Sequence, residues 1–160
     1  MSEVQNEIGD ESLTVREMQA GDAEEVALLA AQLGYDRSAE HIRISIRDLN
    51  HCVGRQAAFV ACVAHQVVGW IEVSIERRLQ TPAFALIGGL VVKEGIRSRG
   101  IGRQLCERAE AWSWEQGIDT VRVTSRSTRA DAHRFYFRNG YELVKTSTVF
   151  EKKSPERRRP

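Results

Sequence analysis

The feature that most constrains the fold of this chain is an apolar run that is followed by a glycine-rich loop and then by a helix. An apolar run of this kind predicts a buried strand, so the fold must carry a strand that leads into a helix N-terminus. The backbone N–H groups and the dipole at such a terminus attract anions. The residues that we expect to form this site are Leu90, Val91, Val92, Arg97, Ser98, Arg99, Gly100, Ile101, Gly102 and Arg103.

The loop residues suit a phosphate group. Gly100 and Gly102 have no Cβ, so a phosphate oxygen can approach their backbone, and Arg97, Arg99 and Arg103 carry guanidinium groups that fork onto phosphate oxygens. The loop lacks the lysine followed by Ser or Thr of a nucleoside-triphosphate loop, and it lacks the three-glycine dinucleotide fingerprint. We therefore predict a pyrophosphate site of another kind. An ordinary strand-to-helix turn with solvated arginines is the alternative that these residues leave open.

Composition excludes several classes of protein. The chain has 160 residues and a formal net charge of +1, which implies one domain with no general attraction to nucleic acid or membranes. No apolar run reaches the roughly 18 residues that span a bilayer, and we expect a cytoplasmic protein. The three cysteines, Cys52, Cys62 and Cys106, lack metal-ligand spacing, so we expect reduced thiols and no metal. Residues 12–153 are predicted to form the domain, with a flexible tail at 1–11 and a basic tail at 154–160.

Hydrophobic periodicity predicts alternating strands and helices. A two-residue break at His65-Gln66 predicts an antiparallel hairpin, and Thr128 to Asp131 resembles a helix capping box. The pair Gly88-Gly89 inside a strand predicts a bulge or the close approach of another backbone or a ligand. The fold class is mixed α/β (α+β), a sandwich of about six to seven strands and about four helices. Strands are expected at 13–18, 57–64, 67–76, 84–92, 120–124, 141–144 and 147–152, and helices at about 22–33, 38–49, 101–117 and 130–138.

Two motifs together resemble the GNAT superfamily of acyl-CoA-dependent N-acetyltransferases. Arg97-Ser98-Arg99-Gly100-Ile101-Gly102, after the strand ending in Leu90-Val91-Val92, is similar to that family's coenzyme A pyrophosphate loop, Arg/Gln-x-x-Gly-x-Gly/Ala. The segment from Ala132 to Tyr141 is similar to the helix ending that closes the other side of the acyl-CoA groove. The motifs occur in the family's order with a predicted strand between them.

The resemblance implies a splayed, mostly antiparallel sheet in which two neighbouring parallel strands part to admit the pantetheine arm. The predicted bulge at Gly88-Gly89 would sit on the central strand, where the N–H of Leu90 or Val91 polarises the acetyl carbonyl. Acetyl-CoA would be the co-substrate and an amine the acceptor, with no metal. A homodimer is a further expectation from the family.

Three residues in or just before the second motif receive roles from the resemblance. Tyr136 would protonate the departing coenzyme A thiolate, as a phenol with a pKa near 10 can do. The alternative is that Tyr136, Ala132 and Phe135 form only the buried face of a short helix. Arg129 stands where many relatives have Asn, and it either lies near the coenzyme's phosphates or faces water. His133, on the same helix, is a further candidate for contact with the coenzyme.

The resemblance leaves the general base unassigned, because many family members carry a glutamate on the central strand where this chain has Gly88-Gly89. An alkyl ammonium has a pKa near that of lysine, about 10.4, so a group must take the proton of the attacking amine. Glu72, on the polar face of the preceding strand, is the best candidate, and Glu76 and His133 are weaker ones. A solvated strand residue is the alternative for Glu72.

These features predict an acetyl-CoA-dependent N-acetyltransferase that works by direct transfer in a ternary complex. A protein acetyltransferase acting on N-termini or lysines, and a non-catalytic acyl-CoA sensor, remain as alternatives. We expect the segments 33–49 and 77–83 to recognise the acceptor, whose identity the sequence leaves open.

Overall fold

The computed structural model describes residues 12–96 and 99–158, which fall into two compact units divided after Thr124. The expected tail at residues 1–11, together with Arg97 and Ser98 of the predicted loop, lies outside the described residues. Of the basic segment 154–160, residues Pro155–Arg158 form a short 3-10 turn.

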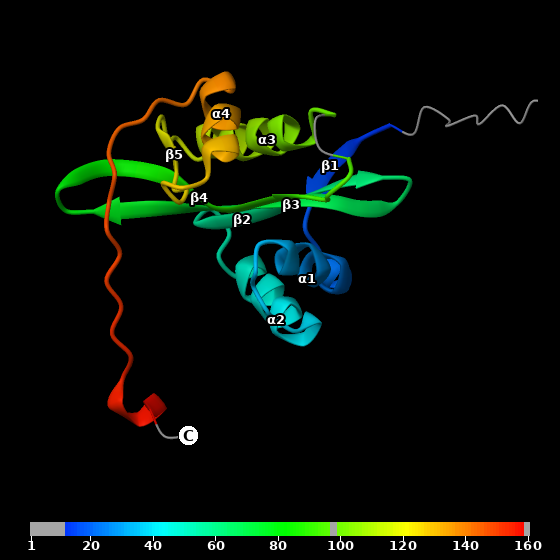
Figure 1. The fold of residues 1–160 in the computed structure, drawn as a ribbon, viewed down its shortest axis with the longest axis horizontal. Coiled ribbons are helices and arrows are strands. Elements are labelled where there is room, and N and C mark those ends of the chain that lie inside the picture. Colours follow the sequence, from blue (N-terminus) through cyan, green and yellow to red (C-terminus); the bar gives the residue numbers. More distant parts are fainter. Residues whose placement is uncertain (1–11, 97–98, 159–160) are drawn as a thin grey trace, which may run out of the picture. The chain divides into compact units, whose positions relative to one another are not determined.

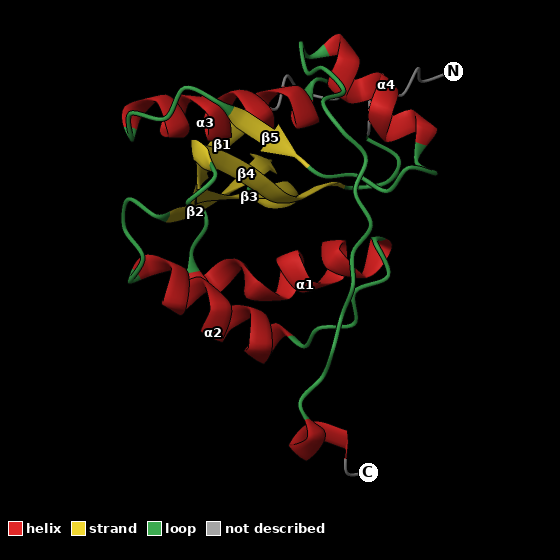
Figure 2. Ribbon diagram, turned by 90° about the vertical axis from the view of Figure 1, so that its left-hand side faces the viewer, coloured by secondary structure: helices red, strands yellow, loops and turns green. Residues whose placement is uncertain are grey.

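The first unit is a five-stranded sheet with helices on both faces (Figures 1 and 2). Its strands lie in chain order, the first four antiparallel to their neighbours and the fifth parallel to the fourth. Two helices cover one face of the sheet and the third covers the other. The elements are β1 (Thr14–Glu17), α1 (Ala23–Gln32), α2 (Ala39–Asn50), β2 (Gln56–Val63), β3 (Gln66–Arg78), β4 (Thr81–Val92), α3 (Ile101–Glu115) and β5 (Val121–Val123), with a 3-10 turn at Ala20–Asp22 before α1. This confirms the predicted mixed α/β class, with fewer strands than the six to seven expected.

Local signals fix the ends of these helices. The Ser38 hydroxyl accepts a hydrogen bond from the backbone N–H of His41, which caps α2. Gly34 follows α1 in the left-handed conformation that ends many helices. Asp22 occupies the cap position of α1, but its carboxylate bonds to the guanidinium of Arg16 and to the backbone N–H of Gln19, so it stabilises the preceding turn instead.

The main apolar core lies between the sheet and the α1–α2 pair, and on the opposite face α3 buries Leu105, Cys106 and Ala109. The three cysteines are free thiols. Within the described residues, no helix combines the length and apolar character needed to cross a membrane. The core on the α1–α2 side is formed by Met18, Ala23, Val26, Leu29, Ile46, Ala58, Val60, Cys62, Val67 and Val91, with Leu33, Ile42, Leu49 and Trp70 packed against it.

Two local predictions, the position of one hairpin turn and a helix capping box, were wrong. The β2–β3 turn is Ala64-His65, one residue earlier than predicted, and both residues have positive φ while Gln66 already pairs with Val63. A two-residue hairpin turn needs left-handed residues, and the hydrophobic pattern carries no information on which pair adopts them. The capping box at Thr128 to Asp131 does not form, because Arg129 holds the cap position and no side-chain cap bond is present.

The second unit contains α4 (Ala130–Arg138), with the bounds predicted from the sequence, and its described residues contain no strand. The predicted strands at 141–144 and 147–152 are therefore wrong. Leu143, Val144, Val149 and Phe150 lie exposed. Alternation shows that a segment is able to line a sheet, but a strand forms only beside a hydrogen-bonded neighbour, and this segment has none among the described residues.

Candidate functional site

The centre of the site is a bulge in β4. Glu72 of β3 pairs with Gly89, whereas the next residue, Val73, pairs with Ile87, so Gly88 is the extra residue in the ladder. This confirms the bulge predicted from the glycine pair. A bulge bends its strand and changes the direction of nearby side chains and backbone groups.

The partner strand ends where the bulge begins. β5 pairs with β4 only as far as Ile87, opposite Val123, while β4 continues to Val92 along β3. The parallel pair therefore parts, as the splayed sheet requires. Because N–H and C=O groups alternate between the two edges of a strand, part of the backbone from Gly88 to Val92 faces an edge that has no strand among the described residues. That the N–H of Leu90 or Val91 donates to a thioester carbonyl stays a prediction.

The glycine pair makes room for two side chains of β3. A Cβ at Gly89 would lie 2.8 Å from two carbons of the Trp70 ring, and a Cβ at Gly88 would lie 3.2 Å from Oε1 of Glu72. The indole and the carboxylate thus lie against the stretch of β4 that has no side chains. The carboxylate that β4 itself lacks is supplied to this position by β3.

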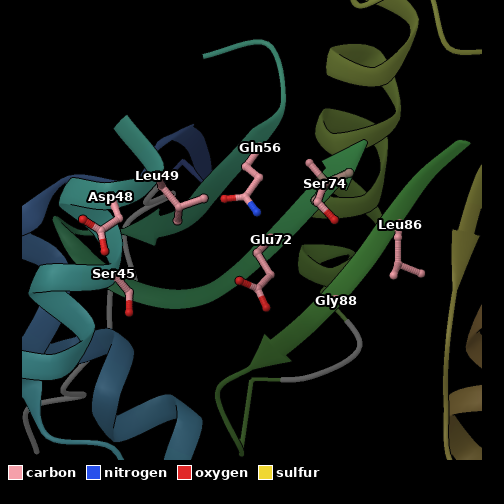
Figure 3. Close-up of a pocket in the computed structure, with 9 residues that line it drawn as sticks. Ser45, Asp48, Leu49, Gln56, Glu72, Ser74, Leu86 and Gly88 are labelled. Carbon is pink, nitrogen blue, oxygen red and sulfur yellow. The ribbon is translucent and has the colours of Figure 1, made fainter. Parts of the chain in front are cut away.

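Glu72 lines an open pocket of about 350 Å³ on the side of the sheet that carries α2 (Figure 3). Pockets that bind small molecules begin at about this size. The charged side chains that the described residues contribute to the lining are both carboxylates. The lining residues are Ser45, Asp48 and Leu49 from α2, Gln56 from β2, Glu72, Val73 and Ser74 from β3, and Leu86 and Gly88 from β4.

Glu72 is an exposed residue of β3, although the protein atoms around the pocket remove part of the hydration of its carboxylate. Burial raises the pKa of Glu72 above its usual value, because the ionised form loses hydration. No described side chain donates a hydrogen bond to it or forms an ion pair with it. A raised pKa makes this carboxylate a stronger base than a solvated glutamate.

The two weaker base candidates are placed differently. Glu76 is absent from the pocket lining, and its carboxylate accepts a hydrogen bond from the hydroxyl of Ser74, 2.9 Å away. His133 belongs to the second unit, where a ring nitrogen lies 3.0 Å from the carbonyl oxygen of Arg126. Glu72 is therefore the base candidate that the pocket contains.

The start of α3 has the features of an anion site. Gly100, the residue before the helix, has a φ of +76° and space around the position of a Cβ, and it has no side chain to cap the helix. The first turn contains no acidic residue. Buried Ile101 anchors that turn to the core, whereas Arg99 is exposed beside it. The described part of the predicted loop is therefore suited to an anion, and its role in binding the pyrophosphate of coenzyme A stays a prediction.

Arg103 differs from the other predicted phosphate ligands. Its Nε lies 2.8 Å from Oε1 of Glu107, one helical turn on, and both side chains are largely exposed. Gly102 is half-buried on the same turn. In this arrangement Arg103 is shared with a carboxylate, so an anion would have to compete for it.

Gln32 was missed by the sequence reasoning. Its side-chain amide donates to the carbonyl of Val92, 3.2 Å away, and its carbonyl accepts from the N–H of Glu94, 3.0 Å away. The end of α1 is thereby tied to the point where β4 leaves the sheet for the loop. Gln32 is the last residue of its helix, and neither periodicity nor motif distinguishes it from a solvated position.

The second unit holds the remaining predicted residues. Tyr136 is half-buried on α4, with edge-on ring contacts to Phe135 and Tyr141 at centroid distances of 5.3 and 5.7 Å. Arg129 lies exposed at the start of α4. No residue of α4 is buried, so Tyr136, Ala132 and Phe135 form a half-buried face and not the buried face of the structural alternative. The roles of Tyr136, Arg129 and His133 stay predictions.

Comparison with known proteins identifies the family of this chain. The model of the acetyltransferase (GNAT) family matches residues 24–141, which include the bulge, the start of α3 and α4. The chain belongs to the GNAT family. It is 34% identical over 108 residues to an uncharacterised N-acetyltransferase of Chlorobaculum tepidum, a match that covers 68% of this chain and 58% of the relative.

A second relative is the aminoalkylphosphonate N-acetyltransferase of Salmonella typhimurium, 35% identical over 78 residues, or 48% of this chain and 51% of the relative. The matches thus span little more than half the length of these relatives. Among solved structures, an aminoglycoside N-acetyltransferase in complex with CoA superposes with a TM-score of 0.79 over 89% of this chain and 96% of its own, at 16% identity. At that identity the superposition establishes the fold.

Proposed function

We propose that this chain transfers the acetyl group of acetyl-CoA to a primary amine by direct attack within a ternary complex. The observation that carries the proposal is the Glu72 carboxylate, which lies against the glycine bulge of β4 in an open pocket and has a raised pKa. Family membership supplies the reaction class.

Glu72 acts as the general base. The incoming amine must lose a proton to attack, and an ammonium group has a pKa near 10.4. Because desolvation raises the pKa of Glu72, the difference between the pKa of the ammonium and the pKa of Glu72 is smaller. Proton transfer from the ammonium to Glu72 is therefore less unfavourable. The amine nitrogen then forms the C–N bond with the thioester carbonyl carbon.

The edge of β4 beyond Ile87, which has no strand beside it among the described residues, stabilises the oxygen of that carbonyl. Backbone N–H groups that a strand partner does not occupy act as fixed donors to the negative charge that develops in the transition state. Cleavage of the C–S bond restores the carbonyl and releases coenzyme A thiolate, which takes a proton from Tyr136. The nitrogen then gives its extra proton to the tyrosinate, and Glu72 releases its own proton to solvent. The products are the acetylated amine and the free thiol.

The start of α3 and Arg99 hold the pyrophosphate of the coenzyme. The helix N-terminus offers backbone donors, and Gly100 leaves the approach open. Held at this point, the coenzyme's arm runs along the parted edge of β4, so thioester and amine meet at the bulge. Orientation of the two substrates contributes much of the rate in such a reaction.

The test is release of coenzyme A thiol from acetyl-CoA across a panel of amines that includes a lysine peptide, with Glu72→Gln and Tyr136→Phe beside the wild type. We expect acetylated amine by mass spectrometry and a loss of kcat of roughly 100-fold or more in Glu72→Gln, the range for general bases. Tight binding of acetyl-CoA without turnover on any amine would contradict the proposed enzyme and favour the non-catalytic acyl-CoA sensor.

A further inference from the structure

The pocket holds a second carboxylate that the proposed chemistry does not use. Asp48 projects from the last turn of α2, with Ser45 one turn earlier on the same side of the pocket, while Glu72 lies between them and β4 (Figure 3). Asp48 is exposed, and no described side chain bonds to its carboxylate. An acid with no internal partner at the wall of a pocket contributes little to folding, so its role is sought in binding.

The local field at this wall is negative. Asp48 lies at the C-terminal end of a twelve-residue helix, where the helix dipole favours cations. Among the described residues, the pocket lining contains two carboxylates and no lysine, arginine or histidine. Arg47 precedes Asp48 in the chain, but it is not part of the lining. The other polar groups there, Ser45, Gln56 and Ser74, are neutral.

We infer that Asp48 determines acceptor specificity by binding a second cationic group of the substrate, so that the preferred acceptor is a diamine or polyamine. This inference rests on the proposed function, since it assigns the attacking amine to Glu72 and the second ammonium to Asp48. The two acidic residues come from different elements, α2 and β3, and line the same pocket. A substrate with two separated amino groups satisfies both, whereas a monoamine leaves Asp48 without a partner.

The same charges select against anionic acceptors. A phosphonate or carboxylate on the acceptor would meet Asp48 and Glu72, and like charges in a shared pocket repel. The relative from Salmonella typhimurium is named for an aminoalkylphosphonate, which is an anionic acceptor. The lining of this pocket therefore points to a different substrate class from that relative's.

The experiment compares three acceptors with the full chain and acetyl-CoA: an α,ω-diaminoalkane, the monoaminoalkane of the same length, and the corresponding aminoalkylphosphonate. We expect kcat/KM to be about tenfold higher for the diamine than for the monoamine, and lowest for the phosphonate. In Asp48→Asn the preference for the diamine falls to near one. Asp119→Asn, a matched change at an exposed loop after α3, keeps the wild-type preference.

Calorimetric titration of the diamine in the presence of coenzyme A separates this inference from the proposed function. Binding that weakens about tenfold in Asp48→Asn supports the assignment of Asp48 even where no amine is turned over, an outcome that would overturn only the catalytic proposal. Turnover that favours the monoamine or the phosphonate, or a diamine preference that survives in Asp48→Asn, would overturn the inference and leave the proposed function standing.

Discussion

The two adjacent glycines of β4 provide the sharpest test of the site, because alanine at each should have a different effect. At Gly89 the new Cβ would lie 2.8 Å from two carbons of Trp70, about 0.7 Å inside the ~3.5 Å at which carbon atoms pack. The indole packs against the core between the sheet and α1–α2, so it has little room to move. At Gly88 the nearest atom is Oε1 of Glu72 at 3.2 Å, the mobile end of a side chain.

The magnitudes follow from these contacts. Overpacking a core costs roughly 1–3 kcal/mol, and removing a glycine from a strand returns about 0.5–1 kcal/mol. We therefore expect Gly89→Ala to lower the free energy of unfolding by about 1–2 kcal/mol, or roughly 3–6 °C in Tm for a chain of this size. Gly88 does not have a positive φ, so Gly88→Ala should change stability by about 0.5 kcal/mol or less. Its methyl group displaces the Glu72 carboxylate, and kcat should fall about tenfold or more.

Urea unfolding of the two variants and the wild type measures stability, and thiol release measures kcat under the same conditions. Each variant serves as the other's control, since they differ by one position in the chain. A Gly88→Ala protein with unchanged kcat would refute the placement of the base at the bulge. Equal losses of stability in both variants would refute the distinction between a mobile carboxylate and a packed indole.

Three further outcomes follow from the described contacts. Desolvation raises the pKa of Glu72 in the folded state, so ionised Glu72 destabilises the fold above that pKa, and this cost is absent below the unfolded pKa near 4.3. Glu72→Gln should therefore be more stable than wild type at pH 7, by a margin that shrinks as the pH falls. The variant should also lose the decrease in kcat/KM that the wild type shows at acidic pH. A margin independent of pH in urea titrations would argue against that desolvation. Gln32→Leu removes both hydrogen bonds at the end of β4. Calorimetry should show that this variant binds coenzyme A several-fold more weakly, while its unfolding midpoint changes little. Unaltered affinity would mean that the loop holds its position without Gln32. Arg99→Glu should weaken coenzyme A binding roughly tenfold to hundredfold, while Arg37→Glu, an exposed control before α2, should not; equal affinities would remove the pyrophosphate assignment.

Much of this molecule was predictable from its sequence, because the relevant signals are local. The order of strand, loop and helix from Leu90 to Ile101 follows from periodicity and from glycine at a position that needs a positive φ. The bulge at Gly88 was predictable because a glycine pair inside a strand is costly without a structural reason. The two strands predicted at 141–144 and 147–152 were wrong because the signal used for them was only local. These segments alternate like strands, but alternation cannot provide a hydrogen-bonded neighbour.

Tertiary structure alone decided which side chains meet at the site. Glu72 was a candidate base from its place on a polar strand face, but only the register of β3 on β4 sets its carboxylate against Gly88. Asp48 lies within the segment 33–49 that the sequence assigns to acceptor recognition, but no pattern distinguishes it there, and Gln32 carries no signal at all. The packing of α2 on the sheet brings Asp48 to the pocket, and the packing of α1 brings Gln32 to the end of β4. Periodicity reports which face of an element is buried, whereas cross-strand register and helix packing determine which atoms lie opposite each other. The proposed chemistry depends on cross-strand register and helix packing.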